Sequence, residues 1–164
     1  MVLNTADKNI FPTENIFNIN NTNFEDIALQ IFQFQYNNNA LYRDFCNSLH
    51  KNINNVMELT DIPFLPISFF KTHRIQTTNF TEEKTFESSG TTGSINSKRF
   101  VKDIGLYERS FIQHFTSFYG AAENYCILGL LPSYLERGNS SLVYMVDKLI
   151  ALSNDNDSGF YLNN

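Results

Sequence analysis

Apolar residues recur at helical spacing near the start of the chain. One set steps by three or four positions through Phe24, Ile27, Ala28 and Ile31, as the buried face of an amphipathic helix does. Thr22 is followed three residues later by Glu25, the arrangement of a capping box. This pattern predicts a first helix from about residue 23 to residue 35.

A second periodic set follows the asparagine run at residues 37–39. Leu41, Phe45 and Leu49 recur at every fourth position, which predicts another helix. The short break between the two helices favours an antiparallel pair that packs together. We therefore interpret residues 1–60 as a helical scaffold.

Beyond residue 60 the pattern becomes extended. Asp61-Ile-Pro-Phe-Leu-Pro-Ile-Ser-Phe-Phe70 carries two prolines, which exclude a regular helix interior and favour an extended apolar connection across the core. Lys84-Thr-Phe86 and Phe100-Val101 are prone to form strands, and the residues from Ser88 to Ser97 between them are almost all Ser, Thr, Gly and Asn. The prediction is a strand, a long polar loop and a second strand.

Helical and extended patterns alternate through the rest of the chain. An aromatic stripe predicts a helix from about residue 103 to 119, with Asp103 as its cap and Gly120 at its end. Tyr125 to Leu131 is a continuous apolar run, typical of a strand buried on both faces, and this would bury Cys126. A helix capped by Ser140 or Ser141 and an extended segment at residues 159–162 follow.

The order of elements predicts the α/β fold class, with a helical N-terminal segment followed by a mixed or parallel sheet with flanking helices. We expect one domain over residues 1–164, with its α/β part at residues 61–164. The chain ends at Asn164, directly after an extended segment, which indicates the N-terminal part of a larger protein.

Charge and composition exclude several functional classes. The net charge is −5 and the basic residues are scattered, so the basic surface that nucleic-acid binding requires is missing. No run approaches the roughly 20 apolar residues of a membrane span, and the N-terminus lacks the signal-peptide pattern, so we expect a cytoplasmic protein. Cys46 and Cys126 lie far apart without metal-ligand spacing, which argues against a metal site.

The strongest candidate for chemistry is the loop Ser88-Ser-Gly-Thr-Thr-Gly93. Its two glycines can adopt positive φ, so that successive backbone N–H groups converge on an anion, and its hydroxyl groups add donors. A nearby cation would offset the charge of a triphosphate. The predicted phosphate-binding residues are Ser88, Ser89, Gly90, Thr91, Thr92, Gly93 and Lys98. By composition alone, the segment could equally be a flexible turn.

Three motifs carry a family resemblance. The loop at residues 88–93 resembles the phosphate-loop signature of the adenylate-forming (ANL) superfamily, although Ser94-Ile-Asn-Ser-Lys98 follows where the common pattern has Pro-Lys-Gly. Pro63-Phe-Leu-Pro-Ile-Ser-Phe-Phe-Lys71, Phe86-Glu-Ser-Ser-Gly-Thr-Thr-Gly93 and Leu131-Pro-Ser-Tyr-Leu-Glu-Arg-Gly138 occur in that order. Together they resemble the LuxE-type acyl-protein synthetase family.

That resemblance implies a ligase that uses ATP and Mg²⁺ to activate a fatty acid as an acyl-adenylate and then transfers the acyl group to a protein thiol. In bioluminescent systems a reductase partner then receives the acyl group. We expect the catalytic residues beyond Asn164, so that this chain alone is weakly active or inactive. Tyr134 follows the predicted buried strand, where open α/β sheets bind ligands, and is a candidate for the substrate pocket; otherwise it is a half-buried tyrosine after Pro132.

A second function also fits the sequence. The glycine loop could be only a turn, and the aromatic helix surfaces could dock a reductase or carrier partner, which would make the chain a non-catalytic interaction module.

Overall fold

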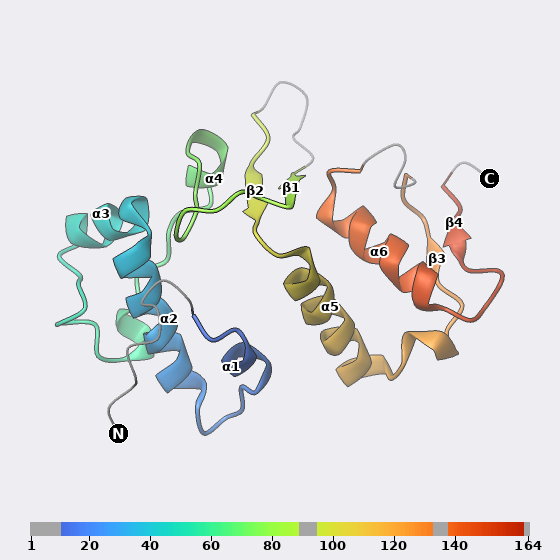
Figure 1. The fold of residues 1–164 in the computed structure, drawn as a ribbon, viewed down its shortest axis with the longest axis horizontal. Helices are drawn as coiled ribbons and strands as arrows, with labels where there is room; N and C mark the ends of the chain where they lie inside the picture. Colours follow the sequence, from blue (N-terminus) through green and yellow to red (C-terminus); the bar gives the residue numbers. More distant parts are fainter. Residues whose placement is uncertain (1–10, 89–94, 133–137, 163–164) are drawn as a thin grey trace. The chain divides into compact units, whose positions relative to one another are not determined.

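The computed structural model describes residues 11–88, 95–132 and 138–162. Figure 1 shows the order of the helices and strands along the chain. The chain forms two compact units: the first comprises residues up to Phe80 apart from residues 70–72, and the second comprises those three residues and everything from Thr81 onward.

The first unit is helical. Its elements are α1 (Glu14–Phe17), α2 (Phe24–Asn38), α3 (Ala40–Ser48) and the short 3-10 helix η1 (Leu59–Asp61). Of α4 (Phe69–Thr72), Phe69 belongs to this unit and the other three residues belong to the second. The two predicted helices are therefore confirmed as α2 and α3. Their shared core is built on Phe32, Tyr42, Cys46 and Val56.

Two details of these helices differ from the sequence prediction. The capping box does not form: α2 begins after Asn23, the Thr22 hydroxyl donates to the Asn20 side chain at 2.6 Å, and the Glu25 carboxylate accepts from the backbone N–H of Leu59 at 3.0 Å. The Glu25 carboxylate, which a capping box would require, therefore binds the backbone N–H of Leu59 instead. The buried face of α3 also differs from the predicted one: Tyr42 and Cys46 are buried, whereas Leu49 is half exposed.

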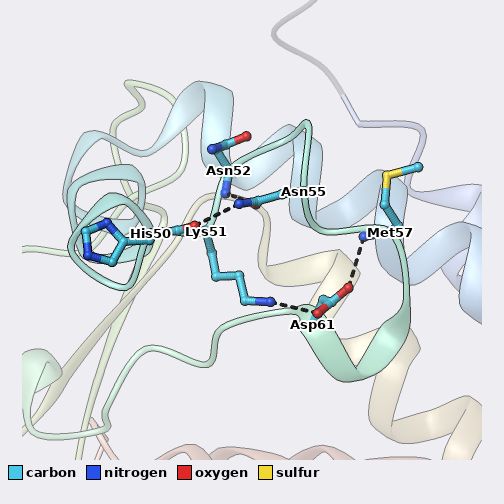
Figure 2. Close-up of polar contacts among 6 residues, drawn as sticks. All are labelled: His50, Lys51, Asn52, Asn55, Met57 and Asp61. Atoms are coloured by element: carbon cyan, nitrogen blue, oxygen red, sulfur yellow. Dashed lines mark hydrogen bonds and ion pairs between the residues drawn. The ribbon is translucent and has the colours of Figure 1, made fainter.

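The loop that leaves α3 is held by polar contacts (Figure 2). Lys51 forms an ion pair with Asp61 at 2.7 Å, and the other Asp61 carboxylate oxygen accepts from the Met57 N–H at 3.3 Å. The Asn55 amide donates to the carbonyl of His50, whose φ is 56°, at 2.8 Å. These contacts close the loop between α3 and η1.

The proline segment only partly enters the core. Ile62 and Leu65 pack against the first unit's core, and the Tyr42 hydroxyl donates to the Pro63 carbonyl at 2.6 Å. Phe64 and Ile67, however, are 81% and 78% exposed. An extended chain turns successive side chains to opposite sides, so the expected connection across the core is wrong for these two residues.

The second unit combines helices with two small sheets. Strands β1 (Lys84–Glu87) and β2 (Lys98–Val101) pair antiparallel. They are followed by α5 (Ile104–Tyr119), η2 (Ala122–Asn124), β3 (Leu128–Gly129), α6 (Ser141–Leu152) and β4 (Gly159–Phe160). Strands β3 and β4 pair in parallel on either side of α6 in sequence, which confirms the predicted strand–helix–strand order and is compatible with the α/β class.

The predicted ends of the helices in this unit are confirmed. The Asp103 carboxylate accepts from Leu106 N–H at 3.1 Å at the start of α5, and Gly120 ends that helix with a φ of 86°. Ser140 caps α6 by accepting from Val143 N–H at 3.4 Å. Helices α5 and α6 lie side by side over a shared core (Figure 1), whose buried members are Phe86, Phe111, Ala122, Tyr144 and Leu149.

The apolar run at residues 125–131 is not a strand buried on both faces. Only Leu128 and Gly129 form a strand, and Leu128 and Leu130 are 59% and 71% exposed. Gly129 packs closely: a Cβ there would lie 2.9 Å from the Phe160 ring and 3.1 Å from Val146. The described part of this sheet has two strands, so alternate side chains of β3 face solvent.

None of the described helices combines the length and apolar character needed to cross a membrane.

Candidate phosphate-binding hairpin

The predicted phosphate loop connects the two strands of an antiparallel hairpin. Strands β1 and β2 pair in the register Glu87 opposite Lys98, which confirms the predicted strands on both sides. Residues 89–94, including Ser89, Gly90, Thr91, Thr92 and Gly93, lie outside the described residues. Ser88 and Lys98 are described and mark the two roots of the loop.

Hydrogen bonds close the base of this loop. The Ser88 N–H donates to the Ser97 carbonyl at 3.0 Å, and the Ser97 N–H donates to the Ser88 hydroxyl oxygen at 3.0 Å. A hydroxyl that accepts one bond still carries a proton that it can donate. Ser88 therefore closes the hairpin and keeps the capacity to donate to an anion.

Opposite charges face each other at the same place. The Lys98 ammonium lies 3.4 Å from a Glu87 carboxylate oxygen, and the two side chains are 54% and 29% exposed. An exposed ion pair of this kind contributes only about 0–1 kcal/mol. Lys98 can therefore exchange this partner for an anionic ligand at small cost, while the Glu87 charge opposes the arrival of that ligand.

Aromatic packing attaches the hairpin to the helices. Phe86 is 4% exposed, and its ring centroid lies 5.2 Å from that of Tyr107 on α5 and 5.5 Å from that of Tyr144 on α6. The Tyr107 hydroxyl donates to the Ser141 carbonyl at 3.1 Å. The strand that leads into Ser88 is thus held by an aromatic cluster.

A polar network borders this cluster. The Tyr144 hydroxyl donates to the Glu108 carboxylate, and the Lys148 ammonium lies 2.9 Å from the same carboxylate. Burial, followed by the bond to Glu108 and its charge, raises the pKa of Tyr144 to about 12. The bond from Tyr144, followed by that from Lys148, lowers the pKa of Glu108. At neutral pH the tyrosine is therefore neutral and the carboxylate is ionised.

The hairpin also contacts the residue that follows the third sequence motif. The Glu87 N–H donates to the Asn139 carbonyl at 2.8 Å, directly after Gly138. Tyr134 lies within residues 133–137, outside the described residues, so its place in a substrate pocket stays a prediction. The backbone bond nevertheless shows that the residue directly after the third motif lies beside the root of the loop.

The two cysteines have different surroundings. Cys46 is fully buried, and its burial raises the pKa of its thiol. Cys126 is exposed, so its predicted burial is wrong. Local desolvation and the neighbouring Asp155 carboxylate nevertheless raise the pKa of the Cys126 thiol, which disfavours its thiolate. In the described part of the chain, no group of three or more His, Cys, Asp or Glu side chains is arranged to hold a metal ion.

Sequence reasoning missed Glu87 and the network of Glu108, Tyr144 and Lys148. Tyr144 and Lys148 stand four positions apart, the spacing of neighbours on one helix face, which was an available signal. Their partner Glu108 lies on a different helix, and no local spacing could have identified it.

The chain was compared with known proteins. The model of the acyl-protein synthetase family LuxE matches residues 9–152. A Long-chain-fatty-acid--luciferin-component ligase of Photorhabdus luminescens is 41% identical over 68 residues, which cover 41% of this chain and 58% of that protein. A protein of the same name from Vibrio harveyi is 35% identical over 96 residues, covering 57% of this chain and 23% of that protein.

The matched stretches thus span less than two thirds of the length of either relative. No solved structure matches the chain significantly. The family model spans well over half of the chain, and it includes the hairpin, its loop and the helices that hold them. This protein therefore belongs to the LuxE acyl-protein synthetase family.

Proposed function

We propose that this protein acts in the ATP-dependent activation of a long-chain fatty acid, and that its loop at residues 88–93 binds the β- and γ-phosphates of ATP. The observation that carries the proposal is the hairpin, which sets Ser88 and Lys98 at the two ends of a Ser/Thr/Gly loop. The two ligase relatives support the substrate class, because their names specify a long-chain fatty acid.

In this proposal the loop residues share the binding of the phosphates. Glycines such as Gly90 and Gly93 would let the backbone approach a phosphate closely, so that backbone N–H groups could donate to its oxygens. The hydroxyls of Thr91 and Thr92 add neutral donors, and Lys98 leaves Glu87 to offset the negative charge. Mg²⁺ bound together with the nucleotide would withdraw negative charge from the leaving pyrophosphate.

The proposed first step joins the carboxylate to the nucleotide. A fatty-acid carboxylate oxygen attacks the α-phosphorus of ATP, the bond from that phosphorus to the bridging oxygen breaks, and pyrophosphate leaves. Negative charge grows on the departing pyrophosphate, so preorganised donors around it lower the barrier. The products are an acyl-adenylate and pyrophosphate.

The proposed second step transfers the acyl group to a protein thiol. A thiolate attacks the acyl carbon, the carbon–oxygen bond to the adenylate breaks, and AMP leaves with the bonding electrons. We assign this thiol neither to Cys46, which is buried, nor to Cys126, whose raised pKa disfavours the thiolate. A reductase partner would then receive the acyl group.

Titration calorimetry with Mg·ATP tests the phosphate loop directly. We expect Gly90→Ala and Thr92→Ala to weaken ATP binding, while Thr60→Ala, an exposed threonine of the first unit, leaves it unchanged. In the full-length enzyme, fatty-acid-dependent exchange of pyrophosphate into ATP should fall about 10²- to 10³-fold for a lost donor. Unchanged binding and exchange in both loop variants would refute the proposed clamp.

The interaction module remains the second candidate, and exposed apolar side chains favour it. Phe118 near the end of α5 is 71% exposed, and Leu128 and Leu130 at β3 are 59% and 71% exposed. If the chain serves only to dock a reductase or carrier, Gly90→Ala should alter folding alone. Phe118→Ser should then weaken binding of that partner in a pull-down with the purified protein.

A further inference from the structure

The phosphate-loop hairpin depends on packing outside itself. A two-stranded hairpin is only marginally stable alone in water, and each strand here has four residues. Among these eight strand positions, Phe86 is the one that is buried. The order of the loop base therefore depends strongly on what contacts the Phe86 ring.

Tyr144 on α6 contacts both β1 and α5. Its ring contacts the Phe86 ring edge to face at 5.5 Å and has the Lys84 ammonium 6.0 Å from its centroid, so it touches β1 at two places. Its hydroxyl donates to Glu108 on α5. The ring is 8% exposed, and this leaves little room for it to move.

Glu108 and Lys148 fix the orientation of that ring. Lys148 lies 2.9 Å from the Glu108 carboxylate and 5.5 Å from the Tyr144 ring centroid. The Lys148 ammonium thus holds the Glu108 carboxylate in place, and the carboxylate in turn orients the Tyr144 hydroxyl. Ionised acceptors make stronger hydrogen bonds than neutral ones do.

We infer that Tyr144 is a positioning residue for the candidate phosphate site: held by Glu108 and Lys148, it fixes Phe86 two residues before Ser88 and so orders the hairpin base that carries Ser88 and Lys98. Tyr144 acts through the strand and touches no substrate in this account. The inference rests on the proposed function, because Ser88 and Lys98 belong to the site that would bind the ATP phosphates. Donors fixed in advance bind an anion without an ordering cost on binding.

Two measurements on the same variants test this inference. Hydrogen exchange reports the protection of the backbone at residues 84–101, and calorimetry reports the affinity for Mg·ATP and for pyrophosphate. Tyr144→Phe keeps the ring and removes the bond to Glu108. We expect faster exchange in the hairpin and roughly two- to thirtyfold weaker binding of both ligands.

Three further variants separate positioning from general destabilisation. Glu108→Ala should reproduce the effect of Tyr144→Phe, whereas Glu108→Gln keeps an acceptor for the tyrosine and should restore most of the hairpin's protection. Tyr125→Phe removes a hydroxyl from another tyrosine of the second unit, one that donates to the Tyr119 carbonyl. It should change neither the hairpin exchange nor the affinity. If Tyr144→Phe fails to fold, the pair of Glu108 variants carries the test.

The outcomes of these measurements decide whether Tyr144 positions the hairpin. Faster exchange confined to the hairpin, together with weaker binding, supports the inference. Unchanged hairpin exchange, unchanged affinity in a protein that binds ATP, or equal acceleration throughout α5 and α6 would overturn it. If the wild-type protein binds neither ligand, the proposed function itself fails and the inference falls with it.

Discussion

Replacing Phe86 with alanine should destabilise the second unit strongly. The side chain is 4% exposed and belongs to a cluster with buried or half-buried residues of β2, α5 and α6. Deleting a buried phenylalanine costs about 3–5 kcal/mol. Phe86 also loses two ring partners, Tyr107 and Tyr144, and aromatic pairs add about 0.5–1.5 kcal/mol beyond burial. We therefore place the cost in the upper half of that range, about 4–5 kcal/mol.

Two companion variants calibrate this value. Phe86→Leu retains most of the buried volume and should cost about 1–2 kcal/mol, because only the ring contacts are lost. Phe64→Ala removes the same atoms from a side chain that is 81% exposed. That control should change the free energy of unfolding by no more than about 0.5 kcal/mol.

Urea unfolding provides the assay, with hydrogen exchange to locate the effect. The free energy of unfolding should fall in the order Phe64→Ala, Phe86→Leu, Phe86→Ala, and exchange should accelerate in residues 84–101. Since small domains have only about 5–15 kcal/mol of stability, the alanine variant should unfold at much lower urea. A loss below about 1 kcal/mol, or one equal to that of Phe64→Ala, would refute the account of Phe86 as the anchor of the hairpin.

Three further predictions concern charges and a helix cap. The pKa of Asp61 is lowered from 3.8, first by its bond from Lys51. The pair therefore stabilises the fold above that pH and loses its effect as the pH falls through the lower folded pKa. Urea unfolding of wild type and Asp61→Asn should differ at neutral pH and converge well below pH 3.8; a difference that persists in acid would contradict this. Glu87→Gln should tighten Mg·ATP binding about two- to fivefold at low salt and less at high salt, because it releases Lys98 and removes a negative charge; calorimetry that finds equal affinities would rule out this competition. Asp103→Ala should lower the free energy of unfolding by about 0.5–2 kcal/mol, and Asp103→Asn by much less, since asparagine also caps helices well; equal losses in urea unfolding would argue against the cap.

Local patterns predicted most of the helices and their ends. Asp103, Gly120 and Ser140 act within four residues of themselves, through one hydrogen bond or one backbone angle, so their roles can be inferred from neighbouring positions. The strands around the phosphate loop were predictable for the same reason, because β-prone residues change abruptly to Ser, Thr and Gly. The family resemblance came from three short motifs that can be recognised in the sequence alone.

Partners distant in sequence were not predictable. The capping box failed because Glu25 bonds to Leu59, which lies 34 residues away. The burial of residues 125–131 was overestimated because the described sheet around β3 has two strands, so half of an apolar run faces solvent. In both cases the sequence pattern itself was present. It could not show which distant part of the chain, or whether solvent, would face these residues.

The sequence by itself determined most of the helices, the two strands on either side of the polar segment, and the resemblance to the LuxE-type acyl-protein synthetase family. Only the tertiary structure decided that Glu87 faces Lys98, that Glu87 bonds to Asn139, and that Glu108 on one helix orients Tyr144 on another. The physical reason is range: helix periods, caps and turns depend on contacts within a few residues, whereas side-chain networks depend on which faces meet after the chain has folded.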